Sequence, residues 1–346
     1  MSYRVGEILL LETYSSSSDA SWTAFKRLPV LAELVLIAAV FTVLIPVLHV
    51  HRVNDYMIFC IFVLSFDLLY GYMGRLSFGQ MLYLGTGAYV SAIFSIHVNG
   101  NPMLSLMAGL AGGTVTAALI GLIVSRLSEA PFALSNLAFN QVGFFLVGST
   151  FQNITNGENG LSAAVESWGY LDFANEYVAY GFILCCFLLV FAGMRFLTAS
   201  PFVVMIRSIK ENEVRVRFLG FNVFWYKWLT FVICGAVAAL AGSLYTLYVG
   251  FISPVFIHPL HNVDVIFACL IVGAGNLYGA IIGGFMFMGM KDIFSNHLAQ
   301  WEWMLGLILL SIVFWFRRGV TGLLASFART PARVSRSRQM EERLEP

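Results

Sequence analysis

The chain has 346 residues, of which 59% are hydrophobic and only 11% are charged. Soluble globular domains carry about 25% charged residues, so this composition excludes an ordinary soluble protein, and the net charge of +1 gives no reason to expect a nucleic-acid partner. Nearly continuous apolar runs of about 20 residues recur along the chain, which is the length that spans a bilayer as a helix. We therefore expect an all-α integral membrane protein, a polytopic helical bundle in the lipid bilayer.

The apolar runs predict about eight to ten spans. A cytoplasmic segment (residues 1–28) precedes a membrane domain (29–320), and a cytoplasmic Arg-rich tail (321–346) follows it. The expected spans are Val30–Val50, Tyr56–Tyr72, Met81–Val98, Met103–Val124, Ala130–Leu146, Tyr177–Leu197, Tyr226–Val249, an interrupted stretch Val263–Met290, and Asn296–Phe316.

Ser200–Lys227 is the one long internal segment dense in both charges and helix signals. Ser200 suits an N-cap, Pro201 suits the first helical position, and Gly220 suits the residue after the helix. Apolar residues recur at helical spacing (Phe202, Met205, Ile206 and Ile209), and the other face carries Arg207, Lys210, Arg215 and Arg217. The segment is either a solvated cytoplasmic loop containing a helical turn or a docking helix that receives force from a soluble partner.

The distribution of Lys and Arg decides the topology, because these residues concentrate in cytoplasmic loops. Placing residues 200–227 inside puts the loop 148–176 outside and the N-terminus inside. If Val263–Met290 is a hairpin that dips into the membrane and returns, only Arg52 and Lys291 of the 20 Lys and Arg residues lie outside. A single pass would leave the arginines of the tail outside as well, so the pattern favours the hairpin and a cytoplasmic C-terminus.

Two glycine-rich runs interrupt the apolar pattern, Gly71–Gln80 in the first half and Gly273–Gly279 in the second. Non-helical backbone at membrane depth is tolerated where it is buried in protein or lines a cavity, and paired interruptions indicate a transporter with an internal repeat. We therefore assign these residues to the translocation pathway: Gly74, Ser77, Gly79, Gln80, Gly85, Gly87, Gly273, Gly275, Asn276 and Gly279. The alternative is helix packing through small residues.

Ionisable and amide groups inside spans are further candidates for the pathway, because their burial in lipid is costly. Asp67 lies well inside its span, and Asn136 and Asn140 form a polar patch in another. Asp67 is either a structural group bonded to a neighbouring span or a substrate contact. The chain has no phosphate-binding loop of the type G-x-x-x-x-G-K-[ST] and no His/Cys cluster at metal-ligand spacing, so we predict no catalytic residues, no metal and no bound cofactor.

Four ordered motifs resemble the branched-chain amino-acid ABC transporter permeases of the LivM type. They are Leu68–Gln80 with Gly85–Tyr89, Leu137–Phe139 with Thr155–Leu161, Arg207–Glu213 with Leu219-Gly220 and Tyr226-Lys227, and Gly273–Gly279. The resemblance runs from about Tyr56 to Gly322. The chain departs from the family pattern at Asp67, Arg75, Asn156 and Ala274, which concerns the substrate more than the fold.

The resemblance implies an importer subunit that pairs with a second permease, normally as a heterodimer in a bacterial inner membrane. Two cytoplasmic ATP-binding subunits would use ATP and Mg²⁺, and a periplasmic solute-binding protein would deliver branched-chain or related hydrophobic amino acids. The coupling residues would be Arg207, Lys210, Glu211, Asn212, Glu213, Arg215, Arg217 and Gly220. The acidic residues of the outer loop (Glu158, Glu166, Asp172 and Glu176) would face the binding protein.

Relatives of this family also suggest urea, short amides, or aromatic or dicarboxylic acids as substrates. A different class, an ion-coupled secondary transporter or channel, would need no ATPase. The single carboxylate in the middle of a span argues against it. An integral membrane enzyme would need convergent acids, bases or metal ligands, and the sequence shows no such cluster.

Overall fold

The computed structural model describes residues 30–164, 173, 175–297, 303–304, 306–307 and 310. Nearly all of these residues are helical, and two strands of two residues each pair antiparallel, with Leu161 opposite Ile252. The predicted tail and most of the predicted span Asn296–Phe316 lie outside the described residues, as do Glu166 and Asp172 of the outer loop.

The first half of the chain contains α2 (Val30–Leu48), α3 (Val50–Asp67), which continues as the π-helix η2 (Leu68–Tyr72), then α4 (Gln80–His97), α5 (Pro102–Val124), α6 (Glu129–Phe145) with η3 (Leu146–Thr150), α7 (Gln152–Thr155), η4 (Gly157–Asn159) and β1 (Leu161–Ser162). The second half contains α8 (Glu176–Ala199), α9 (Pro201–Phe218), α10 (Val223–Val249), β2 (Phe251–Ile252), η5 (Pro254–Ile257), η6 (Pro259–His261), α11 (Asn262–Val272) and α12 (Leu277–His297).

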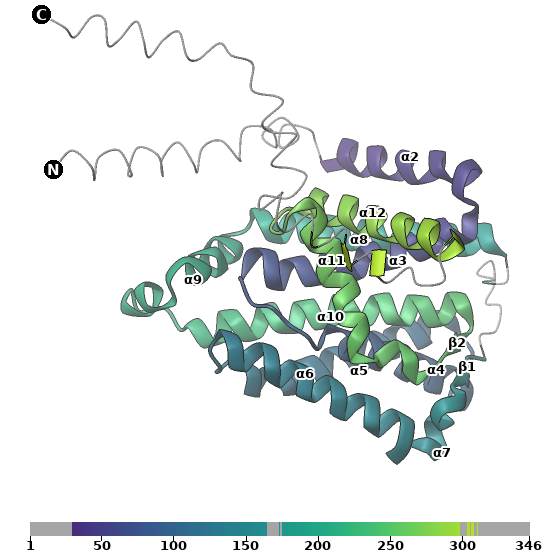
Figure 1. Cartoon of the computed structure of the whole chain (residues 1–346), viewed down its shortest axis with the longest axis horizontal. Coiled ribbons are helices and arrows are strands. Elements are labelled where there is room, and N and C mark those ends of the chain that lie inside the picture. Colours follow the sequence, from purple (N-terminus) through teal and green to yellow (C-terminus); the bar gives the residue numbers. More distant parts are fainter. Residues whose placement is uncertain are drawn as a thin grey trace, which may run out of the picture.

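The long helices lie side by side along one axis, with α9 at one end of the molecule and α7, β1 and β2 at the other (Figure 1). Helix α3 is the centre of the bundle, because it contacts α8, α10 and α12 and is buried along most of its length. Helices α4, α5 and α10 pack together beside it. Glycines allow that close approach: a Cβ on Gly87 of α4 would lie 2.3 Å from the Ala239 carbonyl oxygen of α10.

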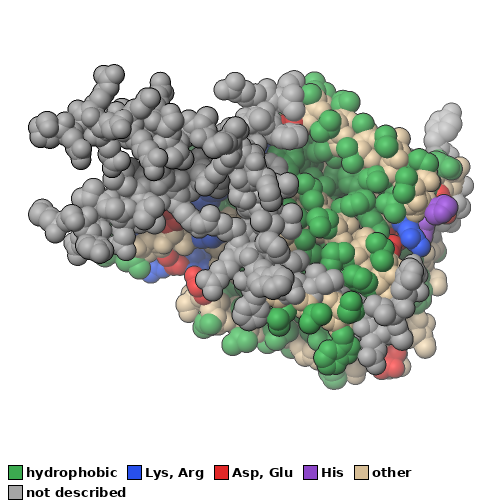
Figure 2. Space-filling model, turned by 45° about the horizontal axis from the view of Figure 1, so that its top comes forward, with side chains coloured by type: hydrophobic (Ala, Val, Ile, Leu, Met, Phe, Trp, Pro, Cys, Tyr) green, Lys and Arg blue, Asp and Glu red, His purple; other side chains and the backbone are tan. Residues whose placement is uncertain are grey.

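Seven helices among the described residues are long and apolar enough to cross a membrane. Helix α4, predicted as the span Met81–Val98, is present but is not one of the seven. Its buried face carries polar groups such as Gln80 and Ser91. On the face in Figure 2 a broad band of hydrophobic side chains separates charged groups at the two ends. This pattern is the one expected of a multi-pass membrane protein.

Helices α11 and α12 form the hairpin that the Lys and Arg distribution predicts. The chain leaves helical geometry between Val272 and Leu277, where Gly273 and Gly275 have φ angles of +112° and +91°. α12 then returns along α3, so that the Tyr56 hydroxyl donates a hydrogen bond to Asp292 Oδ2 at 2.9 Å. The predicted break in this helix is therefore present, at the expected glycines.

The prediction of one continuous helix over 200–220 is wrong at one residue. Asn212 has φ −159° and ψ 95°, which breaks α9 into two segments. Its side-chain oxygen accepts a hydrogen bond from the Arg215 backbone N–H at 2.9 Å, so Asn212 caps the second segment. The predicted ends are confirmed: Pro201 begins the helix, and Gly220 follows it with φ +87°.

Candidate functional site

The two predicted glycine-rich breaks meet each other at the centre of the bundle. A Cβ on Gly71 would lie 2.2 Å from the backbone nitrogen of Gly275 and 2.2 Å from Asp67 Oδ1. Only glycine fits at this contact, because backbone atoms on the opposite side leave no room for a side chain. The π-helical end of α3 and the α11–α12 link are therefore in direct contact, and a movement of one affects the other.

Asp67, at the end of α3, forms a hydrogen bond that links the two glycine-rich breaks. Its Oδ1 accepts hydrogen bonds from the Gly275 backbone N–H at 2.6 Å and from the Cys269 thiol at 3.4 Å. The side chain is fully buried, and Oδ2 accepts no hydrogen bond from the described part of the chain. A carboxylate bonded in this way holds the non-helical turn in place, which is the structural alternative for this residue.

Helix α9 reaches this junction through two basic side chains. Lys210 donates a hydrogen bond from Nζ to the Gly71 carbonyl oxygen at 2.7 Å. The Arg207 guanidinium lies 4.7 Å from the ring centroid of Tyr72, in cation–π contact. The last carbonyl groups of a helix have no intrahelical partner, and Lys210 binds one of these at the end of η2, the Gly71 carbonyl. The first segment of α9 is thus tied directly to the break in α3.

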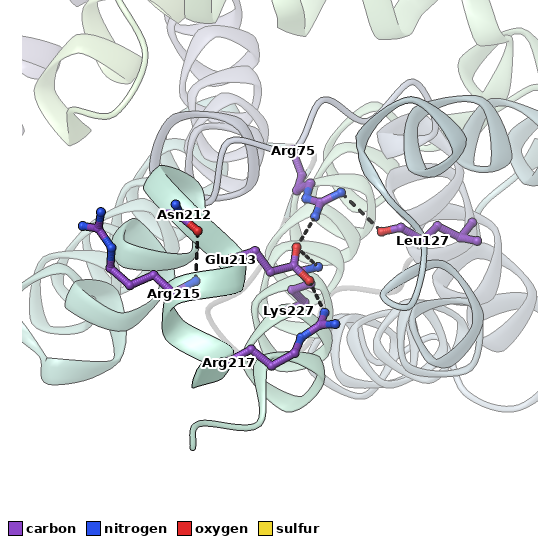
Figure 3. A network of polar contacts seen from close by, with 7 residues as sticks. All are labelled: Arg75, Leu127, Asn212, Glu213, Arg215, Arg217 and Lys227. Atoms are coloured by element: carbon purple, nitrogen blue, oxygen red, sulfur yellow. Dashed lines mark hydrogen bonds and ion pairs between the residues drawn. The ribbon is translucent and has the colours of Figure 1, made fainter. Parts of the chain in front are cut away.

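The second segment of α9 is held by an ion-pair cluster around Glu213 (Figure 3). Glu213 accepts hydrogen bonds from Arg75 at 2.9 Å, from Lys227 at 2.5 Å and from Arg217 at 2.6 Å. Arg75 belongs to the link between η2 and α4 and also donates to the Leu127 carbonyl oxygen, while Lys227 lies in the first turns of α10. The cluster joins α9 to the next helix, α10, and to the η2–α4 link, which is distant in sequence.

The charge state of Glu213 follows from this setting. Burial of the carboxyl group opposes its ionisation, but the hydrogen bond from Lys227 and the positive charges of Lys227, Arg75 and Arg217 outweigh burial and hold the pKa of Glu213 below its usual value. Glu213 is therefore anionic at neutral pH, and the cluster stays paired.

The opposite face of α9 is exposed and has an unusual composition. Large apolar side chains lie there beside Arg215, which points away from the cluster in Figure 3, and Phe218 is 86% exposed. The exposed apolar residues are Val204, Val214 and Phe218 on α9, with Leu219 and Phe221 directly after its end; we call them the α9 apolar face. Helix α9 is not one of the seven membrane-capable helices. Exposed apolar patches outside the membrane mark interaction sites.

Most of the remaining predicted pathway residues bind or pack against other parts of the bundle. Asn136 and Asn140 are fully buried in α6, where Asn140 donates to the Ile257 carbonyl oxygen at 2.6 Å and accepts from Asn262 at 3.1 Å. Ser77 and Gln80 are also buried, and Gln80 donates to the Ser65 hydroxyl. A Cβ on any of Gly79, Gly85 or Gly87 would meet a neighbouring element within 2.4 Å. Close packing therefore accounts for these glycines, and the pathway role of this group stays a prediction.

Of the three other residues of the glycine-rich runs, Gly74 and Asn276 shape turns, and Gly279 lies at the start of α12. Gly74 has φ +74° and leaves room for the Lys210 side chain. Asn276 caps α12, because its side chain accepts a hydrogen bond from the Tyr278 N–H at 3.2 Å. A Cβ on Gly279 would lie 3.1 Å from the Gly273 carbonyl oxygen. In the residues covered by the structure, no cluster of three His, Cys, Asp or Glu side chains could hold a metal ion.

The coupling and pathway assignments omit two residues that the structure brings into the site. Arg75 and Lys227 both bind Glu213, and each is nearly buried. The sequence could have identified both as candidates, because each is a charged residue at the edge of an apolar span and such residues need a partner. Nothing in the sequence identifies that partner.

The fold and the site together define a multi-pass membrane protein whose broken helices are tied to an exposed helical segment at one end. Residues 50–316 match the family described as branched-chain amino acid transport system / permease component. This match covers most of the chain, so the protein belongs to that family of transport permeases.

Individual relatives agree with the family assignment. The chain is 24% identical to the high-affinity branched-chain amino acid transport system permease protein LivM of Escherichia coli, over 76% of this chain and 68% of LivM. It is also 24% identical to the LivH permease protein of Escherichia coli, over 71% of this chain and 84% of LivH. Against the permease protein BraD of Pseudomonas aeruginosa it is 24% identical, over 77% and 91% of the two chains. No solved structure matches the chain.

Proposed function

We propose that this chain is the permease subunit of an ATP-driven importer that carries branched-chain or related hydrophobic amino acids across a bacterial inner membrane. It pairs with a second permease, and two cytoplasmic subunits bind and hydrolyse ATP with Mg²⁺. A periplasmic solute-binding protein delivers the substrate. The names of the LivM, LivH and BraD relatives support the substrate class and a second permease partner.

The observation that carries this proposal is the α9 apolar face. It is an apolar surface outside the membrane-capable helices, and Arg215 on the same side adds positive charge. A soluble subunit that docks there would bury the exposed Phe218 and gain about 1.5–3 kcal/mol for that side chain alone. The ATP-binding subunits are the partners that fit, because the chain itself has no phosphate-binding loop.

Coupling follows from the contacts on the other side of α9. When the ATP-binding subunits move, they displace α9, and Lys210 transmits the displacement to the Gly71 carbonyl. Gly71 is in contact with Gly275, so the α11–α12 link shifts with it. The Glu213 cluster keeps the second segment of α9 attached to the bundle during this movement. Such a movement between two packed arrangements opens the pathway to one side at a time.

The orientation follows from the same assignment. With α9 on the cytoplasmic side, the short loop at Arg126 and both termini are cytoplasmic, while the end that carries α7, β1 and β2 faces the periplasm. The acidic residue Glu158 then lies on the side from which the binding protein approaches.

Reconstitution in liposomes tests the proposal. The chain is co-expressed with its second permease and ATP-binding subunits, and uptake of radiolabelled leucine from the binding protein is measured with and without ATP inside the vesicles. We expect uptake only in the full complex and only with ATP. Uptake by the chain alone, driven by an ion gradient, would overturn the proposal in favour of a secondary transporter or channel.

A matched pair of variants tests the docking surface. Phe218→Asp places a charge on the α9 apolar face and should reduce ATP-dependent uptake at least tenfold, with loss of the ATP-binding subunits on purification. Val98→Asp changes a residue that is 68% exposed at the other end of the molecule and should leave both unchanged. If the two variants show the same ATP-dependent uptake and retain the same amount of ATP-binding subunits, α9 is not the docking site.

A further inference from the structure

A cavity of about 350 Å³ opens toward the end of the molecule opposite α9. Its walls come from α3, α4, α10, α11, α12 and the η5–η6 segment. Small-molecule pockets in proteins measure about 300–1,000 Å³, so the cavity suits a ligand at the small end of that range. None of the predicted pathway residues lines it.

The cavity is divided into an apolar part and a charged part. The apolar part is lined by residues such as Ile58, Phe59, Phe62, Leu84 and Met288. Phe62 is fully buried, whereas the charged side chains remain 21–32% exposed and therefore mark the mouth. These charged residues are Asp55 on α3, Asp264 on α11 and Lys291 on α12.

The charged groups differ in what they already bind. Asp264 Oδ2 accepts from Lys291 Nζ at 3.4 Å and lies 3.6 Å from His261 Nδ1. Asp55 Oδ2 lies 3.7 Å from His51 Nε2, but its Oδ1 is buried and accepts no hydrogen bond from any residue that the structure describes. A buried carboxylate oxygen without a donor is costly, and this one belongs to a side chain that lines the cavity.

The lining of the mouth carries two carboxylates, Asp55 and Asp264, and one ammonium group, Lys291, so carboxylates outnumber ammonium groups there. A ligand ammonium group would be attracted to the Asp55 carboxylate, which lines the cavity and is 29% exposed, and would offset the excess of carboxylates. A ligand carboxylate would be attracted to Lys291 on the facing helix. A side chain extending from the same carbon would enter the apolar part between Phe62 and Met288.

Building on the function proposed above, we infer that this cavity is a receiving site for a zwitterionic α-amino acid with an apolar side chain. Asp55 binds its ammonium group, and Lys291 binds its carboxylate. The same chemistry disfavours the other substrate classes that the sequence left open: a dicarboxylate meets two carboxylates of like charge, and urea or a short amide leaves both the charges and the apolar walls unused.

The site lies in the outer half of the bundle in the proposed orientation. It therefore lies on the side from which a substrate released by a binding protein would arrive, and the buried junction at Gly71 and Gly275 lies further along the same helices. α12 connects the two sites, since it begins directly after the Gly273–Asn276 turn and carries Lys291 near its other end. A movement at the junction thus reaches the cavity through one helix.

Ligand analogues on the purified chain test the inference without relying on transport. Saturation-transfer NMR in detergent compares L-leucine with 4-methylpentanoate, which lacks the ammonium group, and with 3-methylbutylamine, which lacks the carboxylate. We expect leucine to bind at least tenfold more tightly than either analogue, and urea and succinate to give no signal. Equal binding of leucine and both analogues would overturn the assignment of the charged groups.

Variants then assign each charge. Asp55→Asn and Lys291→Met should each weaken leucine binding about tenfold. Asp55→Asn should leave binding of 4-methylpentanoate no weaker than in the unmodified chain, and Lys291→Met should leave 3-methylbutylamine unaffected. His97→Gln, an exposed residue at the same end of the molecule but outside the cavity, is the control. Unchanged leucine binding in both cavity variants would overturn the inference.

A third variant covers the case in which a charge variant does not fold. Met288→Trp narrows the apolar part and should reduce leucine binding much more than alanine binding, whereas an equal effect on both would contradict the site.

The two charge variants, tested in the reconstituted complex, separate this inference from the proposed function. Normal ATP-dependent leucine uptake by Asp55→Asn and Lys291→Met removes this site and leaves the importer function standing, while a complex that shows no ATP-dependent uptake of any amino acid removes the function itself.

Discussion

At the scale of single residues, the Gly71–Gly275 contact leaves no room for any side chain at Gly71. A Cβ at Gly71 would lie 2.2 Å from both a backbone nitrogen and a hydrogen-bonded carboxylate oxygen, and neither can move without opening the junction. We expect Gly71→Ala to destabilise the protein by about 3 kcal/mol or more, the upper end for overpacked positions. Thermal unfolding in detergent, followed by size-exclusion chromatography of heated samples, measures this loss.

The control is a glycine with open space around it. A Cβ on Gly193 of α8 would have no neighbouring atom within 4 Å, and alanine is favoured over glycine in a helix by about 1 kcal/mol. Gly193→Ala should therefore be as stable as the unmodified chain or slightly more so. Equal melting temperatures for the two variants would contradict the contact at Gly71.

Glu213 gives a prediction with a pH dependence. Glu213→Gln leaves Arg75 and Lys227 nearly buried without their counter-ion, which costs about 3 kcal/mol at neutral pH. The pKa of Glu213 is lowered in the folded state from its usual 4.5, so its stabilising effect is complete above that value and is lost as the pH falls through the folded-state pKa. The difference in melting temperature between the two proteins should be largest at pH 6–7 and shrink below about pH 4.5.

Glu211 is the comparison for this titration. It is exposed, lies two positions from Glu213, and makes no ion pair in the described structure. Glu211→Gln should leave the melting temperature and its pH dependence unchanged. If the difference in melting temperature between Glu213→Gln and the unmodified protein stays constant down to pH 3, the side chain acts through packing and not through its charge.

At the scale of elements, the α11–α12 hairpin predicts that the start of α11 and the end of α12 lie on the same side of the membrane. η6 before α11 and the last turn of α12 should both be accessible from the periplasm, whereas α9 should be accessible from the cytoplasm. In a background without the five native cysteines, Leu260→Cys and Ser295→Cys should react with a membrane-impermeant thiol reagent in right-side-out vesicles. Phe218→Cys, the reference for the other side, should react only in inverted vesicles.

The outcome separates the hairpin from a single pass. If Ser295→Cys reacts together with Phe218→Cys and not with Leu260→Cys, the segment crosses the membrane once and the Lys and Arg argument fails. Both positions are exposed, so lack of access to the reagent does not explain a negative result.

The sequence predicts elements whose causes are local. The start of α9 at Pro201, its end before Gly220 and the break after Val272 all follow from the conformational preferences of proline and glycine, and all three are present. The partners of buried charges are not local. Asp67 and Gly275 are 208 positions apart and Arg75 and Glu213 are 138 apart, so their pairing depends on how the helices pack.

The kink at Asn212 shows the same limit within a single element. Periodicity alone favoured a continuous helix, because the apolar spacing through Ile209 is regular. In the folded chain Glu213 binds Arg75 and Lys227, and Asn212 caps the segment that carries Glu213. The tertiary ion pairs therefore override the helical periodicity at this point.

At the scale of the whole molecule, the proposed function requires that one surface be covered by partners and that its displacement be felt at the junction. Hydrogen exchange measured by mass spectrometry on the permease pair, with and without the ATP-binding subunits, tests both parts. We expect amides of α9 to exchange fast in the permease pair, because this helix lies outside the membrane-capable spans, and at least tenfold more slowly once the ATP-binding subunits are present.

The coupling step predicts a second change, at a distance. Trapping the complex with a non-hydrolysable ATP analogue should alter exchange in the Gly273–Asn276 turn, since Lys210, Gly71 and Gly275 form a continuous set of contacts from α9 to that turn. The loop Val98–Asn101 at the other end of α4 serves as the internal reference and should not change. The variant Lys210→Met should abolish the change in exchange at the turn and leave docking of the ATP-binding subunits intact. Protection of α9 in the unmodified complex without any change at the turn would mean that the partner docks as proposed but that the movement reaches the pathway by another route.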